Sequence, residues 1–487
     1  MFQNRNFSST LSSGSHKTSQ KKQKNSHPLI AGTLILSGAG LFTRLLGFYN
    51  RIYLSRLIGA KEMGIYQLIF PVYMIGFSCC CHGIELALSQ MIASSKENST
   101  ARQEMIRTGI SLSLIISFLF SLLIYHYADF ISLILLKEEK CALCLKLMAP
   151  VLPFTAIRCC LHGYYLGLKK TLVPAAGQLI EQIVRVFIIW LIAESYGSQQ
   201  TFTAALAVCG MVIGELAGTI YTYISYKIQI HTELSGNKST FLFQKSSPHD
   251  TKSKHHSHMQ PNPTYSKRST SHPHLPYGKE LCKKALPLTA SKLSLTIFSS
   301  VESIAIPFML TTYYHNRTLA LSLYGVLTGM ALPFILFPST LTNALSLMLL
   351  PAVSEAASSG NKKQIQNTIK KTVSLCLTLG FTALLFFFFF GKKIGLYVFH
   401  EQTAGDFLFI LSFLCPFLYL SSSGTSILNG LGYMKESFFY HIVSIFIRIL
   451  FILFLIPRIG IQGYLYGLLT AYLLLTFLQW NKIRRSL

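Results

Sequence analysis

The sequence predicts an all-α polytopic membrane protein with about twelve transmembrane helices in two six-helix lobes. Hydrophobic residues make up 51% of the 487 residues, and the mean hydropathy is +0.44. Apolar runs long enough to cross a bilayer as helices recur from one end of the chain to the other. Most Lys and Arg residues fall in loops between these runs, as membrane topology favours. These observations exclude a soluble multidomain protein.

The first apolar run, 29–57, carries two arginines that must be explained. Arg44 lies about 22 Å along the predicted helix axis, given a rise of 1.5 Å per residue. Arg51 is seven residues further on, two helical turns away, so both side chains share one face. An arginine at a helix centre costs roughly 2.5–3.5 kcal/mol on insertion scales. We therefore expect this face to line a water-filled cavity or an interface rather than lipid. Arg51 could instead reach the headgroups, as we expect Arg56 to do.

Eleven further runs complete the predicted spans. The spans are 29–57, 64–90, 104–126, 141–166, 171–194, 201–228, 284–313, 323–351, 365–390, 405–430, 436–456 and 459–481. With the N-terminus placed in the cytoplasm, the loops assigned to that side hold most of the Lys and Arg residues. The positive-inside rule therefore predicts cytoplasmic N- and C-termini, which agrees with an even number of spans.

The same pattern divides the chain into four parts. A basic, disordered tail is predicted at 1–28 and a six-helix lobe at 29–228. The segment 229–283 is rich in His, Lys and Ser and reads as a disordered cytoplasmic linker. A second six-helix lobe is predicted at 284–487. Whether the histidines of the linker bind a metal is left open, because no fixed ligand geometry accompanies them.

The two lobes resemble repeats of one another. At an offset of 263 residues, Pro153-Phe154 matches Pro416-Phe417, and Arg185 matches Arg448. Each half has an even number of spans, so both halves run the same way through the membrane. We therefore expect a pseudo-twofold axis along the membrane normal, as in parallel-repeat transporters.

Further ionisable residues lie inside predicted spans, where such residues are functional candidates by default. Glu181 and Arg185 have the favourable i, i+4 order, which indicates a local ion pair. Arg448 lacks such a partner, and so faces the cavity or pairs with another helix. Lys292 and Glu302 are ten residues apart at a similar helical angle, and for them an interhelical structural pair is the competing interpretation. The remaining candidates for coupling or structural ion pairs are Glu85 and Glu215.

No pattern of catalytic residues accompanies these charges, so we do not expect an enzyme. The sequence contains no GxxxxGK[ST], HExxH or GxSxG motif. Cys141 and Cys144 form a CxxC without a second pair or a His box, so no metal centre is predicted. No cofactor is expected, and the net charge of +25 is explained by membrane topology rather than by a nucleic-acid partner.

Several short motifs resemble the multidrug/oligosaccharidyl-lipid/polysaccharide flippase superfamily. Thr43-Arg44-Leu45-Leu46-Gly47-Phe48 and then Arg56-Leu57-Ile58-Gly59-Ala60 are similar to its first-helix signature. Leu350-Pro351-Ala352-Val353-Ser354-Glu355 is similar to the eighth helix of the stage V sporulation protein B and polysaccharide-biosynthesis branch. The resemblance implies two six-helix lobes in a V around one central cavity. It also implies alternating access in a bacterial plasma membrane and a role in cell-wall or spore cortex synthesis.

The resemblance further implies a substrate, namely a lipid-linked oligosaccharide or a peptidoglycan precursor like lipid II, moved from the inner to the outer leaflet. Arg44 stands where related lipid II flippases carry a cavity arginine, whereas their next cavity arginine is Asn50 here. We expect Arg44 and Arg51, with Arg448 and Lys292, to bind the anionic lipid-linked glycan. The membrane lipids are the other expected partners.

Two alternatives remain at this point. A cation-coupled multidrug exporter of the same superfamily would use Na⁺ or H⁺ and would prefer acidic cavity residues such as Glu85, Glu215 and Glu302. A non-transporting membrane scaffold would leave the intramembrane charges as an unexplained cost.

Overall fold

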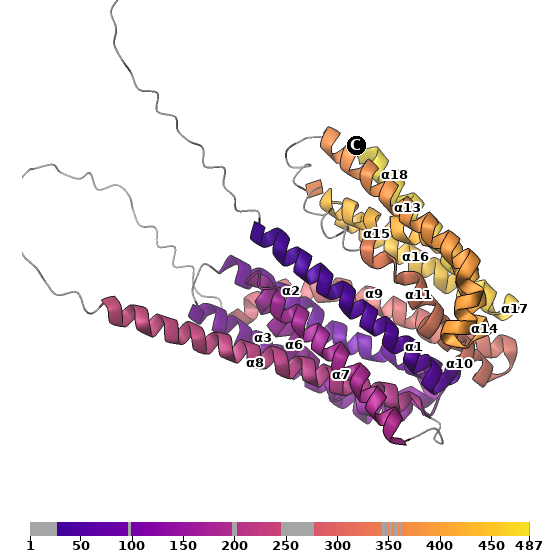
Figure 1. The fold of residues 1–487 in the computed structure, drawn as a ribbon, viewed down its shortest axis with the longest axis horizontal. Helices are drawn as coiled ribbons and strands as arrows, with labels where there is room; N and C mark the ends of the chain where they lie inside the picture. The colour runs from indigo at the N-terminus through magenta and orange to yellow at the C-terminus, as the bar shows by residue number, and fades with distance from the viewer. Residues whose placement is uncertain are drawn as a thin grey trace, which may run out of the picture.

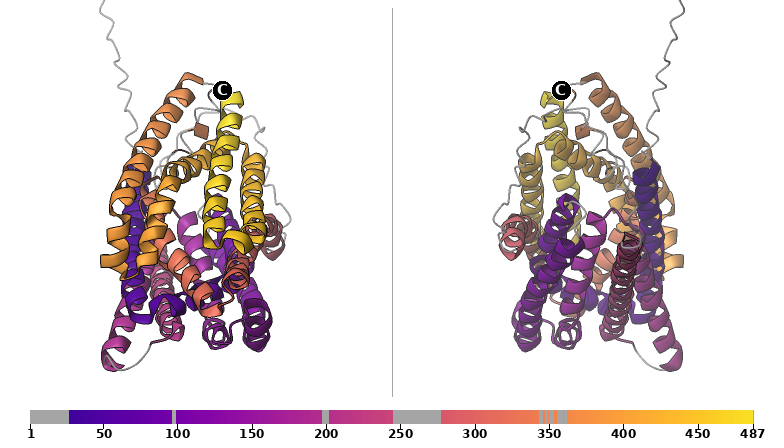
Figure 2. Two further views of the ribbon diagram at one scale, coloured as in Figure 1. Left: turned by 90° about the vertical axis from the view of Figure 1, so that its right-hand side faces the viewer. Right: turned by 90° about the vertical axis from the view of Figure 1, so that its left-hand side faces the viewer.

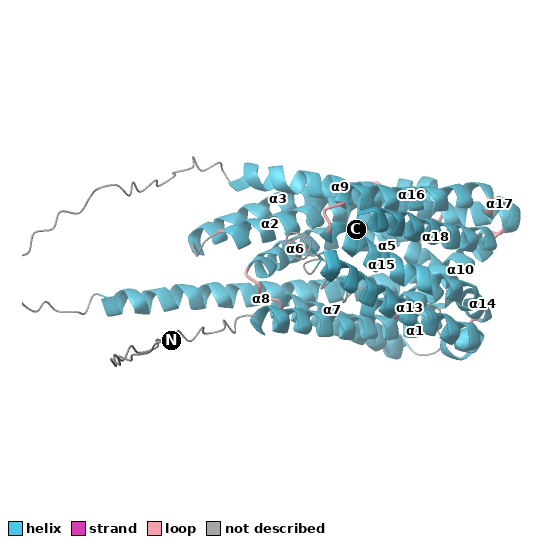
Figure 3. Ribbon diagram, turned by 90° about the horizontal axis from the view of Figure 1, so that it is seen from above, coloured by secondary structure: helices cyan, strands magenta, loops and turns pink. Residues whose placement is uncertain are grey.

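A computed structural model describes residues 27–95, 99–196, 202–244, 277–342, 346, 349, 353–354, 359 and 362–486. Helices make up nearly all of these residues, with no strand among them, and most run in roughly one direction (Figure 3). The first half holds α1 (His27–Phe77), η1 (Ser78–His82), α2 (Gly83–Ser94), α3 (Ser99–His126), α4 (Ala128–Phe130), η2 (Ile131–Leu136), α5 (Cys141–Met148), α6 (Val151–Gly167), α7 (Leu172–Tyr196) and α8 (Ala204–Gln244).

The second half begins after the segment 245–276, which lies outside the described residues. Its elements are α9 (Tyr277–Tyr314), α10 (Arg317–Gly325), η3 (Val326–Ala331), α11 (Leu332–Leu336), α13 (Lys362–Ile394), η4 (Gly395–Phe399), α14 (Gln402–Leu411), η5 (Ser412–Leu414), α15 (Cys415–Gly430), α16 (Met434–Phe454), α17 (Ile456–Ile459) and α18 (Ile461–Ser486). The indigo to magenta helices of the first half lie on one side and the orange to yellow helices α13 to α18 on the other, while the salmon α9 and α10 also pack against α1 (Figures 1 and 2).

The long α1 is broken at Gly59, between the first two predicted spans. Gly59 has φ 76° and ψ 174°, a conformation that L side chains rarely adopt and that glycine adopts freely. Close to this break, Glu62 accepts a hydrogen bond from the backbone N–H of Ala204 at 2.9 Å, at the start of α8. Glu62 also pairs with Lys140 at 2.7 Å, and this hydrogen bond raises the pKa of Lys140. One carboxylate thus joins the break in α1 to the α8 start and to the loop before α5.

The number of membrane spans agrees with the predicted class but does not reach twelve by length and composition alone. Ten helices in the described part of the chain are long and apolar enough to cross a membrane, or eleven if the bent pair α5 and α6 forms one span. One of the ten, Gly40–Ser94, has 55 residues, about twice what a bilayer requires. It contains the Gly59 break and most of the two predicted spans 29–57 and 64–90. The exact number twelve and the pseudo-twofold axis therefore stay predictions.

The two halves meet closely where α1 passes α10. A Cβ added to Gly64 would overlap the carbonyl oxygen of Leu321, and a Cβ on Gly325 would lie 2.8 Å from the Cα of Gly64. Small residues at such a crossing let two helix backbones approach, which is how membrane helices commonly associate. Arg56 adds a second connection, because it donates to the carbonyl oxygens of Val398 at 2.6 Å and Tyr397 at 2.9 Å. The exposed Arg56 therefore binds the carboxyl end of η4 rather than only reaching toward headgroups.

The predicted linker 229–283 is helical at both ends in the structure. The helix α8 continues to Gln244, and α9 begins at Tyr277. The polar composition that predicted disorder is also compatible with a helix, because Lys and Gln are good helix formers. The middle of the linker and the tail up to residue 26 lie outside the described residues.

Candidate functional site

A cavity of about 560 Å³ lies between the two halves. It is partly open, and its walls come from α1, α6, α7 and α8 of the first half and from α11 and the residues after it. Besides Tyr66 and Tyr73, the polar and charged side chains lining it are Thr43, Arg44, Asn50, Arg51, Thr155, Arg158, Gln182, Arg185, Glu215 and Thr340. This is the size of cavity in which proteins usually bind small molecules or parts of larger ones.

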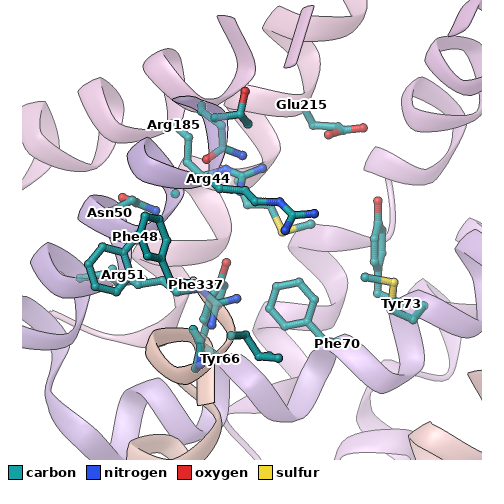
Figure 4. A pocket seen from close by; sticks show the side chains of 18 of the residues that line it. Arg44, Phe48, Asn50, Arg51, Tyr66, Phe70, Tyr73, Arg185, Glu215 and Phe337 are labelled. Carbon is teal, nitrogen blue, oxygen red and sulfur yellow. The ribbon is translucent and has the colours of Figure 1, made fainter. Parts of the chain in front are cut away.

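The two arginines of the first span both line this cavity. Arg44 donates to the hydroxyl of Thr340 at 3.2 Å, and Arg51 lies 3.5 Å from the carbonyl oxygen of Thr328. Both acceptors belong to the second half of the chain and neither is a carboxylate. In Figure 4, Arg44 extends across the middle of the cavity, with Phe70 and Tyr73 beyond it. Two cations that share a face of α1 are thus presented to the cavity without an ion-pair partner among the described residues.

Next to them lies a buried network of four charges. Arg158 on α6 binds Glu181 on α7 at 2.5 Å and Glu215 on α8 at 2.7 Å. Glu181 also pairs with Arg185, one helical turn further along α7. The four charges sum to zero, and the two carboxylates are engaged by arginines. Burial of a pair is tolerated when the geometry is this close, whereas a lone buried charge is costly.

A third group in the cavity wall is polar but uncharged. Thr43, Asn50 and Gln182 each have a buried side-chain oxygen with no hydrogen-bond partner in the described part of the chain. All three residues line the cavity. An unpaired buried oxygen carries a desolvation cost of about 1–3 kcal/mol, so these atoms are available to water or to a ligand.

Some predicted site residues lie elsewhere. Arg448 pairs with Glu302 on α9 at 3.2 Å, and Glu302 also accepts from the hydroxyl of Tyr464 at 2.9 Å. Arg448 lines a separate, smaller cavity of about 240 Å³ within the second half. Lys292 on α9 is exposed and does not line the central cavity. Arg448 and Lys292 therefore do not line the cavity that Arg44 lines in this structure, and their binding of a substrate stays a prediction.

The acidic residues that the sequence proposed as candidates also do not form one group in the central cavity. Glu215 lines the central cavity, but its carboxylate is held by Arg158. Neither Glu85 nor Glu302 lines that cavity. Among the described residues, no three His, Cys, Asp or Glu side chains are grouped so that they could hold a metal ion.

Sequence reasoning missed part of the site. Arg158 was recognisable as a charge inside a predicted span, but its two carboxylate partners come from two other helices and no spacing links them. The aromatic wall of Tyr66, Phe70 and Tyr73 gave no signal, because aromatic residues are frequent in every membrane helix.

Comparisons with known proteins agree with this architecture. Solved structures of the lipid II flippase MurJ in an inward closed conformation and of an inward-facing MATE family transporter of the MOP superfamily match with TM-scores of 0.66 and 0.64. The match to MurJ covers 93% of this chain and 87% of the MurJ chain, at 12% identity. The match to the MATE transporter covers 91% of this chain and 94% of the transporter chain, at 13% identity. The fold is therefore shared well beyond recognisable sequence similarity.

Curated relatives span most of the chain as well. Stage V sporulation protein B of Bacillus subtilis is 24% identical over 94% of this chain and 84% of its own length. The lipid II flippase MurJ of the same bacterium is 20% identical over 92% and 81%.

The candidate membrane spans and the two helical halves define a multi-pass membrane protein, and its fold is shared with a transporter of the MOP superfamily. A family model described as polysaccharide biosynthesis protein matches residues 29–355. The chain belongs to this polysaccharide biosynthesis protein family.

Proposed function

We propose that the protein moves a lipid-linked oligosaccharide or peptidoglycan precursor from the inner to the outer leaflet of a bacterial plasma membrane by alternating access. The observation that carries this proposal is the pair Arg44 and Arg51, two cations facing the central cavity without carboxylate partners among the described residues. A pyrophosphate head bears the complementary charge, and the planar guanidinium fork suits phosphate oxygens. MurJ of Bacillus subtilis, a relative of this chain, is a lipid II flippase, and this supports the same substrate class.

The cavity chemistry argues against the alternatives. An exporter of cationic drugs needs an acidic group free to bind cargo or a coupling ion, and Arg158 already occupies the carboxylate of Glu215. A coupling ion, Na⁺ or H⁺, has no site assigned here. A scaffold without transport would carry the cost of Arg44 in the membrane with no gain.

Arg44 provides the test of this proposal. Arg44→Ala removes the charge and the donor fork, so flipping of a fluorescent lipid-linked oligosaccharide in reconstituted vesicles should slow about tenfold or more, the loss expected for a charge-assisted hydrogen bond. Arg44→Lys keeps the charge without the fork and should slow flipping less. Because Arg44 is exposed to the cavity, both variants should keep the thermal stability of the wild type.

The exposed Arg107 on α3 lies outside the cavity, so Arg107→Ala is the matched control. Normal flipping by Arg44→Ala would remove Arg44 from the substrate site. A loss of folded protein would assign Arg44 a structural role instead.

A further inference from the structure

We propose that Thr43, Asn50 and Gln182 form a neutral subsite that binds hydroxyl or acetamido N–H groups of a sugar, beside the arginines that bind pyrophosphate. We call these three residues the amide subsite. The inference rests on the proposed function and deepens it, because it assigns the glycan part of the head group to particular side chains.

The three residues face one another across a helix contact. Thr43, Gly47 and Asn50 lie at i, i+4 and i+7 on α1 and therefore share one face. Gln182 approaches this face from α7, since a Cβ on Gly47 would lie only 3.5 Å from its Oε1.

Burial makes the unpaired oxygens of this subsite costly unless something binds them. Asn50 is only 7% exposed, yet its Oδ1 has no hydrogen-bond partner in the described part of the chain. The Oε1 of Gln182 and the hydroxyl of Thr43 are also buried and unpaired there. The two unpaired amide oxygens therefore indicate a binding site for hydrogen-bond donors, and the Thr43 hydroxyl beside them can donate or accept.

The unpaired amide oxygens of Asn50 and Gln182 need hydrogen-bond donors, which an ionised pyrophosphate does not supply. The amide oxygens of Asn50 and Gln182 only accept hydrogen bonds. An ionised pyrophosphate also only accepts, so the two would repel. Sugar hydroxyl groups and acetamido N–H groups donate, and they carry no charge that would need an arginine.

On α1, the two arginines and the two residues that this helix contributes to the amide subsite lie next to one another but on different faces. At about 100° per residue, Arg44 and Arg51 point roughly a quarter turn away from Thr43 and Asn50. A ligand whose phosphate lies on the arginines therefore has its first sugar within reach of the amide subsite. The substrate class follows as a pyrophosphate-linked sugar that presents donors next to the anionic linkage.

The test compares two probes in binding measurements on the full chain in detergent. One is a polyprenyl pyrophosphate without sugar, and the other is the same lipid carrying N-acetylglucosamine. Gln182→Leu and Asn50→Leu should weaken binding of the glycosylated probe roughly five- to tenfold, as expected for one lost hydrogen bond. Binding of the sugar-free probe should stay within about twofold, because the arginines are unchanged. Gln462→Leu, at an exposed position of α18 outside the cavity, is the matched control.

Each other outcome has a defined meaning. Equal weakening of both probes would overturn the subsite and place the amides in the pyrophosphate site. No change for either probe would also overturn it, because water would then satisfy the three oxygens. If wild type binds neither probe, the proposed function fails rather than the subsite. Arg44→Ala should weaken both probes together, and thermal unfolding of each variant checks that it is folded.

Discussion

Arg158 is the residue whose removal should damage the folded protein most. It binds two carboxylates from two helices, Glu181 at 2.5 Å and Glu215 at 2.7 Å, and Glu215 is only 4% exposed. Arg158→Leu would leave both carboxylates without this partner inside the membrane. Breaking a buried ion pair in this way costs about 3–5 kcal/mol, so thermal unfolding of the purified protein should occur at a clearly lower temperature.

A second substitution separates this effect from simple loss of packing. Adding Glu215→Gln to Arg158→Leu removes one stranded charge and should recover part of the lost stability. Arg107→Leu, at an exposed site, should unfold near the wild-type temperature. Equal stability of Arg158→Leu and Arg107→Leu would show that the network does not support the fold.

At the scale of elements, the crossing of α1 and α10 depends on the absence of side chains. Gly64→Ala would place a Cβ against the carbonyl oxygen of Leu321, which the backbone of α10 cannot easily move. We expect this variant to push the helices apart, lower thermal stability and reduce lipid flipping. The same substitution at Gly40, also in α1, meets nothing within 4 Å.

Gly40→Ala is therefore the matched control, and alanine should stabilise that helix by up to about 1 kcal/mol. If Gly64→Ala and Gly40→Ala behave alike in unfolding and flipping assays, the close crossing is not required. The expected contrast depends only on what each methyl group meets, since the chemical change is identical.

For the whole molecule, the sequence predicts one orientation in the membrane, with both termini in the cytoplasm. Cys282, near the start of α9, is the one exposed cysteine of the eleven, whereas Cys79 and Cys209 are half-buried and the others buried. If the predicted linker and both termini are cytoplasmic, Cys282 should not react with a membrane-impermeant maleimide in intact cells. It should react after the cells are opened. Labelling in intact cells that disappears in Cys282→Ser would reverse the orientation of every span.

The sequence allowed prediction of the fold class, but not of the surroundings of the arginines. Depth in an apolar run and a two-turn spacing are local properties, so Arg44 and Arg51 could be placed on one face of α1, and both line the cavity. For Arg51 the sequence left the headgroups open as an alternative, and the role of both in substrate binding stays a prediction. The partners of Arg158 are 23 and 57 residues away, and such contacts depend on how helices pack. Arg448 was expected either in the cavity or between helices, and only the positions of Glu302 and Tyr464 decide this. The resemblance placed Asn50 at a cavity position, but nothing in the sequence indicated that its amide oxygen is buried without a partner.

The contact of Arg56 with η4 has a genetic consequence. Both acceptors are main-chain carbonyl oxygens, of Tyr397 and Val398, so no substitution of those two side chains removes the acceptors themselves. The connection is therefore encoded on one side only, by the codon for Arg56. Random mutagenesis should recover loss of this contact mainly through codon 56. Second-site suppressors of Arg56 variants should arise at other contacts between the halves rather than at positions 397 and 398.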